Sequence, residues 1–68
     1  MNKAEAGMRI KIARVGKGFS QAALAERLKV SQATVALWES GSTFPKASNL
    51  VELAELLEIP VEELLKVG

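Results

Sequence analysis

The stretch that decides the fold runs from Ser31 to Gly41 and reads Ser-Gln-Ala-Thr-Val-Ala-Leu-Trp-Glu-Ser-Gly. Ser31 can cap the start of a helix by accepting a backbone N–H, and Gly41 can adopt the left-handed conformation that ends one. The spacing therefore predicts a helix over 31–40. Val35 and Trp38 lie three residues apart on one face, and the other face carries little charge. Such a helix is expected to lie against a partner.

The flanking sequence predicts four more short helices, over about 3–15, 20–28, 47–57 and 61–66. Ser20 caps the second, and Pro45 lies in the loop before the fourth. The first is less regular, because Ala6, Ile10 and Ala13 form one apolar stripe, and a second is formed by Met8, Ile12 and Val15. Residues 8–12 also alternate as a strand would, but we favour a helix. The predicted fold class is all-α, a compact bundle of five short helices in a single domain over 1–68.

The composition excludes several kinds of site. The 68 residues include no cysteine and no histidine, so disulfides, thiolate metal sites and the usual general base are absent. We therefore expect no catalytic residues, no metal, no cofactor and no small-molecule substrate, and the chain is not expected to be an enzyme. No apolar run reaches membrane-spanning length, and residues 1–20 lack a secretion signal. A cytoplasmic protein without membrane contact is the expectation.

The charge is unevenly distributed although the net charge is only +1. Residues 1–19 carry five basic side chains against one acidic side chain, and residues 49–68 carry five glutamates against one lysine. A molecule polarised in this way can turn its basic side towards a polyanion. Ordinary solvated helix faces explain the same pattern equally well, so charge alone does not decide between them.

The order of these segments resembles the Cro/repressor-type helix-turn-helix family, the lambda-repressor-like domains. The resemblance covers residues 21–40, with Ala25 at the helix crossing, and extends through "RIKIAR", "GFSQAALAERL", "SQATVALWESG", "NLVELAELLEI" and "VEELL". The N-terminal domains of lambdoid phage repressors look most similar. The resemblance implies sequence-specific binding of double-stranded DNA by a transcriptional repressor or regulator, with the helix over 31–40 in the major groove.

The resemblance also implies a role for individual residues. The implied base contacts are Gln32, Ala33, Thr34, Ala36 and Leu37. The implied phosphate contacts are Gln21, Ser31, Ser40, Ser42 and Thr43, and Gln21 would also brace Gln32. Glutamine can form a bidentate pair with adenine, and Ala or Leu can contact a thymine methyl. Arg14 and Glu39 occupy positions that pair as a structural, semi-buried ion pair.

Four positions depart from the family pattern. Lys29 stands where the turn usually has glycine, so it must accept a positive φ or remodel the turn, at a cost of about 1 kcal/mol. Leu37 stands where relatives often carry a polar base reader, and Ala33 and Ala36 add no hydrogen bonds. Gln32 is then the one strong direct reader, worth roughly 1 to 3 kcal/mol of discrimination.

Two further hypotheses follow from the resemblance. The first is a weak homodimer, paired through the C-terminal helix region from Val61 to Val67, that binds a pseudo-palindromic operator. Two half-sites would then double the binding free energy that one copy supplies. Alternatively, the chain keeps the fold without the recognition, as a protein-binding module or a redesigned version of such a domain.

Overall fold

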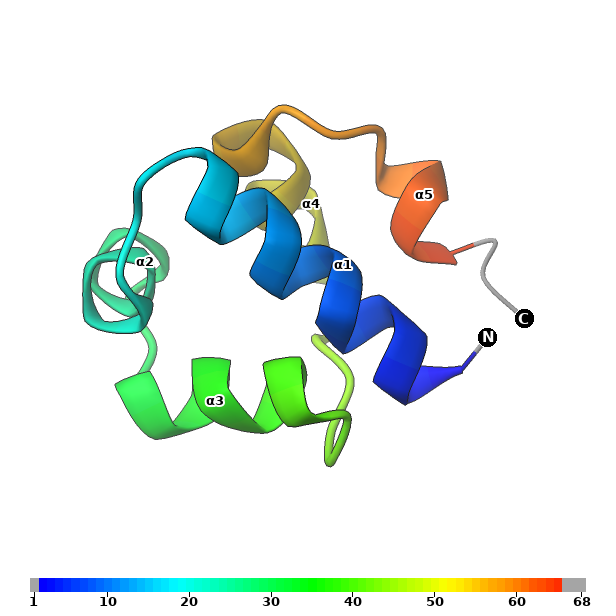
Figure 1. The fold of residues 1–68 in the computed structure, drawn as a ribbon, viewed down its shortest axis with the longest axis horizontal. Coiled ribbons are helices and arrows are strands. Elements are labelled where there is room, and N and C mark those ends of the chain that lie inside the picture. Colours follow the sequence, from blue (N-terminus) through cyan, green and yellow to red (C-terminus); the bar gives the residue numbers. More distant parts are fainter. Residues whose placement is uncertain (1, 66–68) are drawn as a thin grey trace.

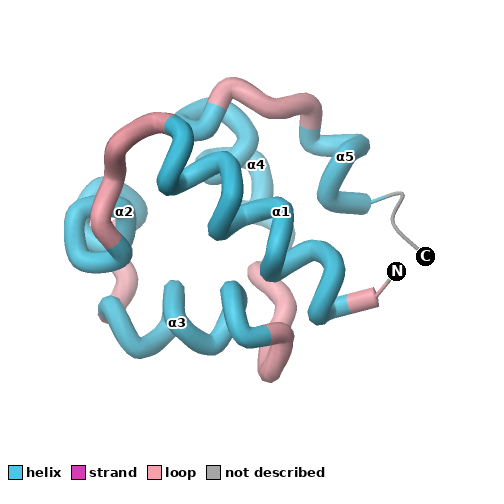
Figure 2. The backbone as a smooth tube through the Cα atoms, in the orientation of Figure 1, coloured by secondary structure: helices cyan, strands magenta, loops and turns pink. Residues whose placement is uncertain are grey.

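The computed structural model describes residues 2–65 and shows five helices packed around one core (Figures 1 and 2). The helices are α1 (Lys3–Gly16), α2 (Gln21–Leu28), α3 (Gln32–Ser40), α4 (Ala47–Leu57) and α5 (Val61–Leu65). Helix α1 crosses the front of the molecule in Figure 1, α3 runs beneath it, and α4 lies behind. The described residues contain no strand, so the all-α, five-helix prediction is confirmed. Residue 66, the predicted end of the last helix, lies outside the described residues.

Side-chain caps set where the first three helices begin. The hydroxyl of Ser20 accepts a hydrogen bond from the N–H of Ala23, and that of Ser31 from the N–H of Thr34. Each serine stays in an extended conformation, and α2 and α3 therefore begin one residue later than the predicted ranges. The side chain of Asn2 caps α1 in the same way.

Helix α1 buries only one of its two apolar stripes. Ala6 and Ile10 are buried and Ala13 is partly buried, so this stripe faces the core. The side chains of Met8, Ile12 and Val15 remain 60%, 65% and 59% exposed. The second stripe therefore adds nothing to the core of this chain.

The core takes at least one large side chain from every helix. Its buried members include Ile10, Leu24, Leu28, Val35, Trp38, Leu50, Leu53, Leu57 and Leu64. No described helix is long and apolar enough to cross a membrane.

Helices α1 and α3 lie close together at Gly7. A Cβ atom built on Gly7 would lie 2.2 Å from the carbonyl oxygen of Trp38 and 2.7 Å from that of Glu39. Real Cβ atoms do not approach backbone atoms this closely, so only glycine fits here. The apolar pattern did not indicate this crossing, because a glycine inside a helix leaves no mark in hydrophobic periodicity.

Lys29 accepts the left-handed conformation at the end of α2. Its φ and ψ are 60° and 41°, and the N–H of Val30 donates to the carbonyl oxygen of Ala25 over 3.0 Å. The turn between α2 and α3 thus keeps the geometry that a glycine would give, and the lysine carries the strain. Glu58 ends α4 in the same conformation, with φ 57°.

We expect Gly7→Ala to lower the free energy of unfolding by about 3 kcal/mol, because the added methyl must push the two helix backbones apart. Gly16→Ala is the matched control in the same helix, since a Cβ there meets no atom within 4 Å. The control should raise stability by about 0.5 to 1 kcal/mol. Urea denaturation followed by circular dichroism measures both, and equal effects would show that the crossing does not require glycine.

We expect Lys29→Gly to raise the free energy of unfolding by about 0.5 to 1 kcal/mol, because relief of left-handed strain outweighs the entropy that glycine adds to the unfolded chain. Lys29→Ala keeps a Cβ and therefore the strain, so it should match the parent protein. Thermal unfolding of the three proteins separates these effects. A stabilised alanine variant would instead assign the gain to the loss of the lysine charge.

Candidate nucleic-acid interface

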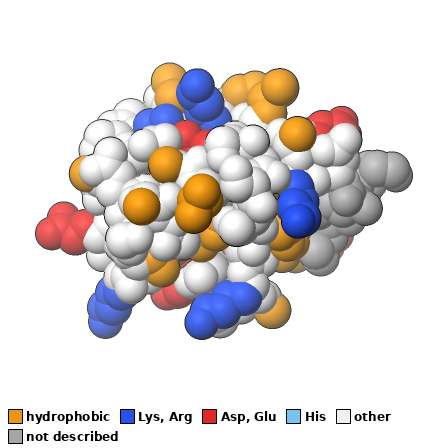
Figure 3. Space-filling view, turned by 90° about the horizontal axis from the view of Figure 1, so that it is seen from below, with side chains coloured by type: hydrophobic (Ala, Val, Ile, Leu, Met, Phe, Trp, Pro, Cys, Tyr) orange, Lys and Arg blue, Asp and Glu red, His pale blue; other side chains and the backbone are white. Residues whose placement is uncertain are grey.

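Helix α3 presents a weakly charged face to solvent. Gln32 and Ala33 are exposed, Leu37 is 45% exposed, and Ala36 is half-buried, while Val35 and Trp38 point into the core. Seen from beneath α3, uncharged and apolar atoms fill the middle of the surface, and basic side chains together with some acidic ones lie towards its edge (Figure 3). This face could enter a groove without burying an unpaired charge.

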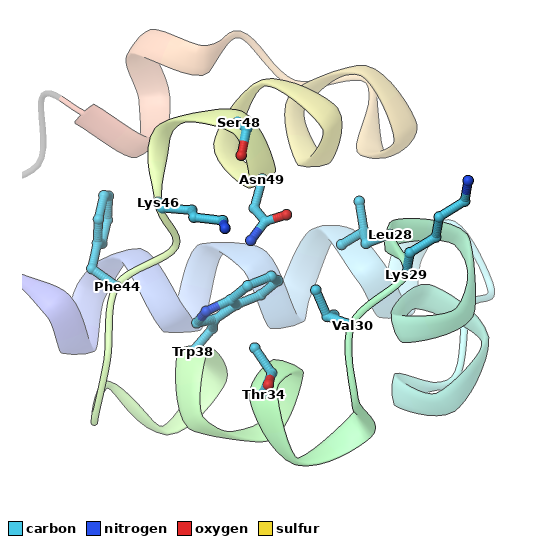
Figure 4. A pocket seen from close by; sticks show the side chains of 9 residues that line it. All are labelled: Leu28, Lys29, Val30, Thr34, Trp38, Phe44, Lys46, Ser48 and Asn49. Atoms are coloured by element: carbon cyan, nitrogen blue, oxygen red, sulfur yellow. The ribbon is translucent and has the colours of Figure 1, made fainter.

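Thr34, the remaining predicted base contact, sits apart from this face. It is half-buried, and its Oγ1 lies 2.9 Å from the hydroxyl of Ser31. With Trp38 and Asn49 it lines a groove of about 490 Å³ between α3 and α4 (Figure 4). Four of the five predicted base-contact residues thus share the outer face, and Thr34 lies on its flank.

Hydroxyl groups lie at both ends of α3. At its start, the hydroxyl of Ser31 accepts from the N–H of Thr34 over 3.1 Å. At its end, Ser40 donates to the carbonyl oxygen of Leu37 over 3.1 Å and lies 3.0 Å from the hydroxyl of Ser42. Ser42 and Thr43 are exposed in the loop that follows. The predicted phosphate contacts therefore divide into one group before α3 and one after it.

A buried ionic network joins three helices behind this face. Arg14 Nε donates to Glu39 Oε2 over 2.6 Å, and a second guanidinium nitrogen reaches Oε1 over 3.1 Å. The third guanidinium nitrogen donates to the carbonyl oxygen of Phe19 over 2.8 Å. The Arg14 and Glu39 side chains are only 10% and 4% exposed. The two residues predicted to pair thus lie in a bidentate contact whose remaining donor fixes the turn before α2.

Gln21 belongs to the same network. Its Nε2 donates to Glu39 Oε1 over 3.0 Å. The structure therefore shows no hydrogen bond between Gln21 and Gln32, the contact by which Gln21 was expected to brace Gln32. The Gln21 amide instead donates to the Glu39 carboxylate, which also binds Arg14. Glutamine has a second amide hydrogen and a carbonyl oxygen, and neither makes a hydrogen bond within the described residues. Gln21 is thus fixed in position with polar atoms still available at the start of α2.

The start of α4 supplies polar groups that the sequence analysis did not single out. Lys46 precedes α4, is exposed, and makes no side-chain cap bond, so the first N–H groups of the helix are uncapped. Figure 4 shows the Lys46 and Asn49 side chains on the wall of the groove opposite Thr34. The sequence could have indicated this position, because a lysine directly before a predicted helix start combines a cation with free N–H groups, and both favour binding of an anion.

A comparison with known families matches a helix-turn-helix model to residues 10–64. The chain belongs to this helix-turn-helix family. The matched range includes α2, α3 and the turn at Lys29, together with both partners of the Arg14 and Glu39 pair. The predicted resemblance to repressor-type domains is confirmed by the solved structures that this chain resembles.

Individual relatives and solved structures are similar to most of this chain. The HTH-type transcriptional activator BcrR of Enterococcus faecalis is 36% identical over 52 residues, which are 76% of this chain and 26% of BcrR. The P22 c2 repressor, solved in complex with a synthetic operator, has a TM-score of 0.84 at 34% identity, covering 90% of this chain and 92% of that one. Bacillus thuringiensis PlcR, solved with the peptide PapR7 and DNA, has a TM-score of 0.87 at 33% identity, covering 94% and 22%.

The length of these relatives differs. The chain matches nearly the whole of the P22 c2 structure but only about a quarter of BcrR and of PlcR. The similarity to the two longer proteins therefore concerns their helix-turn-helix part.

We expect Arg14→Met to lower the free energy of unfolding by about 3 to 5 kcal/mol, because it leaves the Glu39 carboxylate buried without its cation. The double variant Arg14→Met/Glu39→Leu removes both charges and should recover to within about 1 kcal/mol of the parent. Urea denaturation of the parent, the single variant and the double variant measures this. A double variant as unstable as the single one would contradict a buried-charge origin of the loss.

Proposed function

We propose that this chain binds double-stranded DNA in a sequence-specific manner and regulates transcription by occupying an operator. The observation that carries the proposal is the outer face of α3, which is exposed and weakly charged. The bidentate ionic network at Glu39 holds this helix rigidly against α1 and α2. A rigid helix with a bare face and polar groups at both ends fits the major groove.

Direct readout in this proposal rests on one glutamine and three apolar side chains. Gln32, at the start of α3, would form a bidentate pair with adenine, worth roughly 1 to 3 kcal/mol. Ala33, Ala36 and Leu37 would contact thymine methyl groups deeper in the groove. Thr34 would act at the flank, where its hydroxyl already contacts Ser31.

Backbone contacts would come from both sides of the groove. Gln21 and Ser31 would bind phosphate on one strand, with Gln21 positioned by Glu39. Ser40, Ser42 and Thr43 would bind the other strand. Lys46 and the uncapped N–H groups of α4 lie beyond the same loop, and we add them to this second group because a helix N-terminus with a nearby cation favours phosphate.

A single copy would fall short of specific binding. One bidentate pair supplies less than the roughly 4 to 10 kcal/mol that separates specific from non-specific sites. Two copies on a pseudo-palindromic operator would double this free energy of discrimination. Pairing of the two copies through the region from Val61 to Val67 is part of this proposal. Residues 66 and 67 lie outside the described structure. The proposal includes a cytoplasmic location and no catalytic step.

Selection of binding sequences from a randomised duplex pool tests the proposal directly. Enriched sequences and scrambled controls are then compared by fluorescence anisotropy at about 50 and 200 mM salt, because phosphate contacts weaken steeply with salt. Enrichment of a palindromic sequence supports an operator-binding regulator. Binding without sequence preference would favour the alternative of a protein-binding or redesigned domain.

Two substitutions separate base readout from backbone contact. We expect Gln32→Ala to relax the preference at one base pair per half-site, a loss of about 10-fold to 100-fold on the selected sequence only. Gln21→Ala should weaken binding to every duplex alike and reduce its salt dependence. Glu26→Gln, an exposed change on α2 outside the proposed DNA contacts, is the control and should bind at least as well as the parent. Equal losses on all duplexes for both variants would contradict these assignments.

A further inference from the structure

The outer face of α1 carries an apolar ridge that none of the described residues covers. Met8, Ile12 and Val15 follow the spacing i, i+4, i+7 and therefore lie in line along the helix. They are 60%, 65% and 59% exposed, on the side of the helix opposite the buried Ile10. This spacing is the one by which an apolar helix face anchors itself in a partner.

The ridge continues sideways into a shallow apolar groove. A hollow of about 290 Å³ beside Ile12 is lined by Ala13 and Ile59, with Arg9 and Glu63 at its rim. The groove lies between α1 and the segment that leads into α5. Ridge and groove together form one surface, which we call the α1 face: Met8, Arg9, Lys11, Ile12, Val15 and Ile59.

Charge restricts what can cover the α1 face. Arg9 and Lys11 are exposed on either side of the ridge, and Glu63 lines the groove beside it. Arg14 and Lys17 add no free charge here, because they pair with Glu39 and Glu58. A two-fold contact between the α1 faces of two copies would bring the Arg9 and Lys11 cations together. The repulsion between Arg9 and Lys11 therefore disfavours this symmetric pairing and favours an acidic partner surface.

An acidic surface with an apolar centre exists on the other side of the same chain. Val51 is 54% exposed on α4, and Glu52 and Glu55 are exposed around it. We call these residues the α4 face: Val51, Glu52 and Glu55.

We propose that the α1 face of one copy binds the α4 face of a second copy. The contact is heterologous, so each bound copy leaves one free face of each kind and further copies can add in a row. The outer face of α3 belongs to neither surface, since α3 packs on α1 at Gly7, which lies outside the line of the ridge. Copies joined in this way keep their recognition helices free.

Sedimentation velocity without DNA tests the contact, at protein concentrations of about 0.1 to 1 mM because small, polar-rimmed interfaces bind weakly. We expect the weight-average mass to rise with concentration, and the association to weaken about tenfold between 50 and 500 mM salt. Ile12→Ser should abolish it. Circular dichroism should show that this variant is folded, since Ile12 is largely exposed.

Charge reversal identifies the two faces. Arg9→Glu/Lys11→Glu and Glu52→Lys/Glu55→Lys should each remain monomeric alone. An equimolar mixture should associate again, because the reversed α1 face of the first variant then meets the reversed α4 face of the second. Lys29→Glu/Lys46→Glu changes the net charge by the same amount as the first variant, outside both faces, and should associate like the parent.

Three results would overturn the proposal. The first is a parent protein that stays monomeric at all concentrations. This includes the case in which Ile12→Ser changes only the binding to anionic lipid vesicles, which would make the ridge a lipid contact. The second is association that Ile12→Ser and the charge reversals leave unchanged, which would place the contact elsewhere, as in pairing through the C-terminal helix. The third is association of Glu52→Lys/Glu55→Lys by itself, which would exclude the α4 face.

Discussion

The contact between the backbone of α1 at Gly7 and the carbonyl oxygens of Trp38 and Glu39 constrains the whole bundle. Because no Cβ fits between them, the two helices meet at van der Waals distance along their backbones. This closeness lets short side chains such as Ala6 fill the space beside the crossing. It also brings the end of α3 within reach of Arg14, so the ionic network depends on the same approach.

The network converts that closeness into a fixed orientation of the proposed recognition helix. Arg14 is held by α1, Glu39 by α3 and Gln21 by α2, and a single carboxylate joins all three. Burying such a pair contributes little net stability, but the geometry of a planar guanidinium and a carboxylate is highly directional. The network therefore sets the angle at which α3 meets α2 more than it sets the stability of the domain.

The sequence predicted most of the architecture because its signals are local. Serine caps, left-handed helix ends and leucine spacing each act within a few residues, and they predicted the number and order of the helices in the described residues. The close crossing at Gly7 and the bond from Gln21 to Glu39 depend on how distant segments meet, which no local pattern encodes. For the same reason the sequence offered two apolar stripes on α1 with no means of choosing which one the core would bury.

In helix α3 the residues that pack into the fold and the residues that form the outer face are two separate sets. Val35, Trp38 and Glu39 hold the helix in the fold, whereas Gln32, Ala33 and Leu37 contribute almost nothing to the interior. Substitutions in the second set are therefore nearly free of folding cost. Such a helix can be rewritten one exposed position at a time, so a lineage of these domains can change what it reads while its scaffold stays under purifying selection.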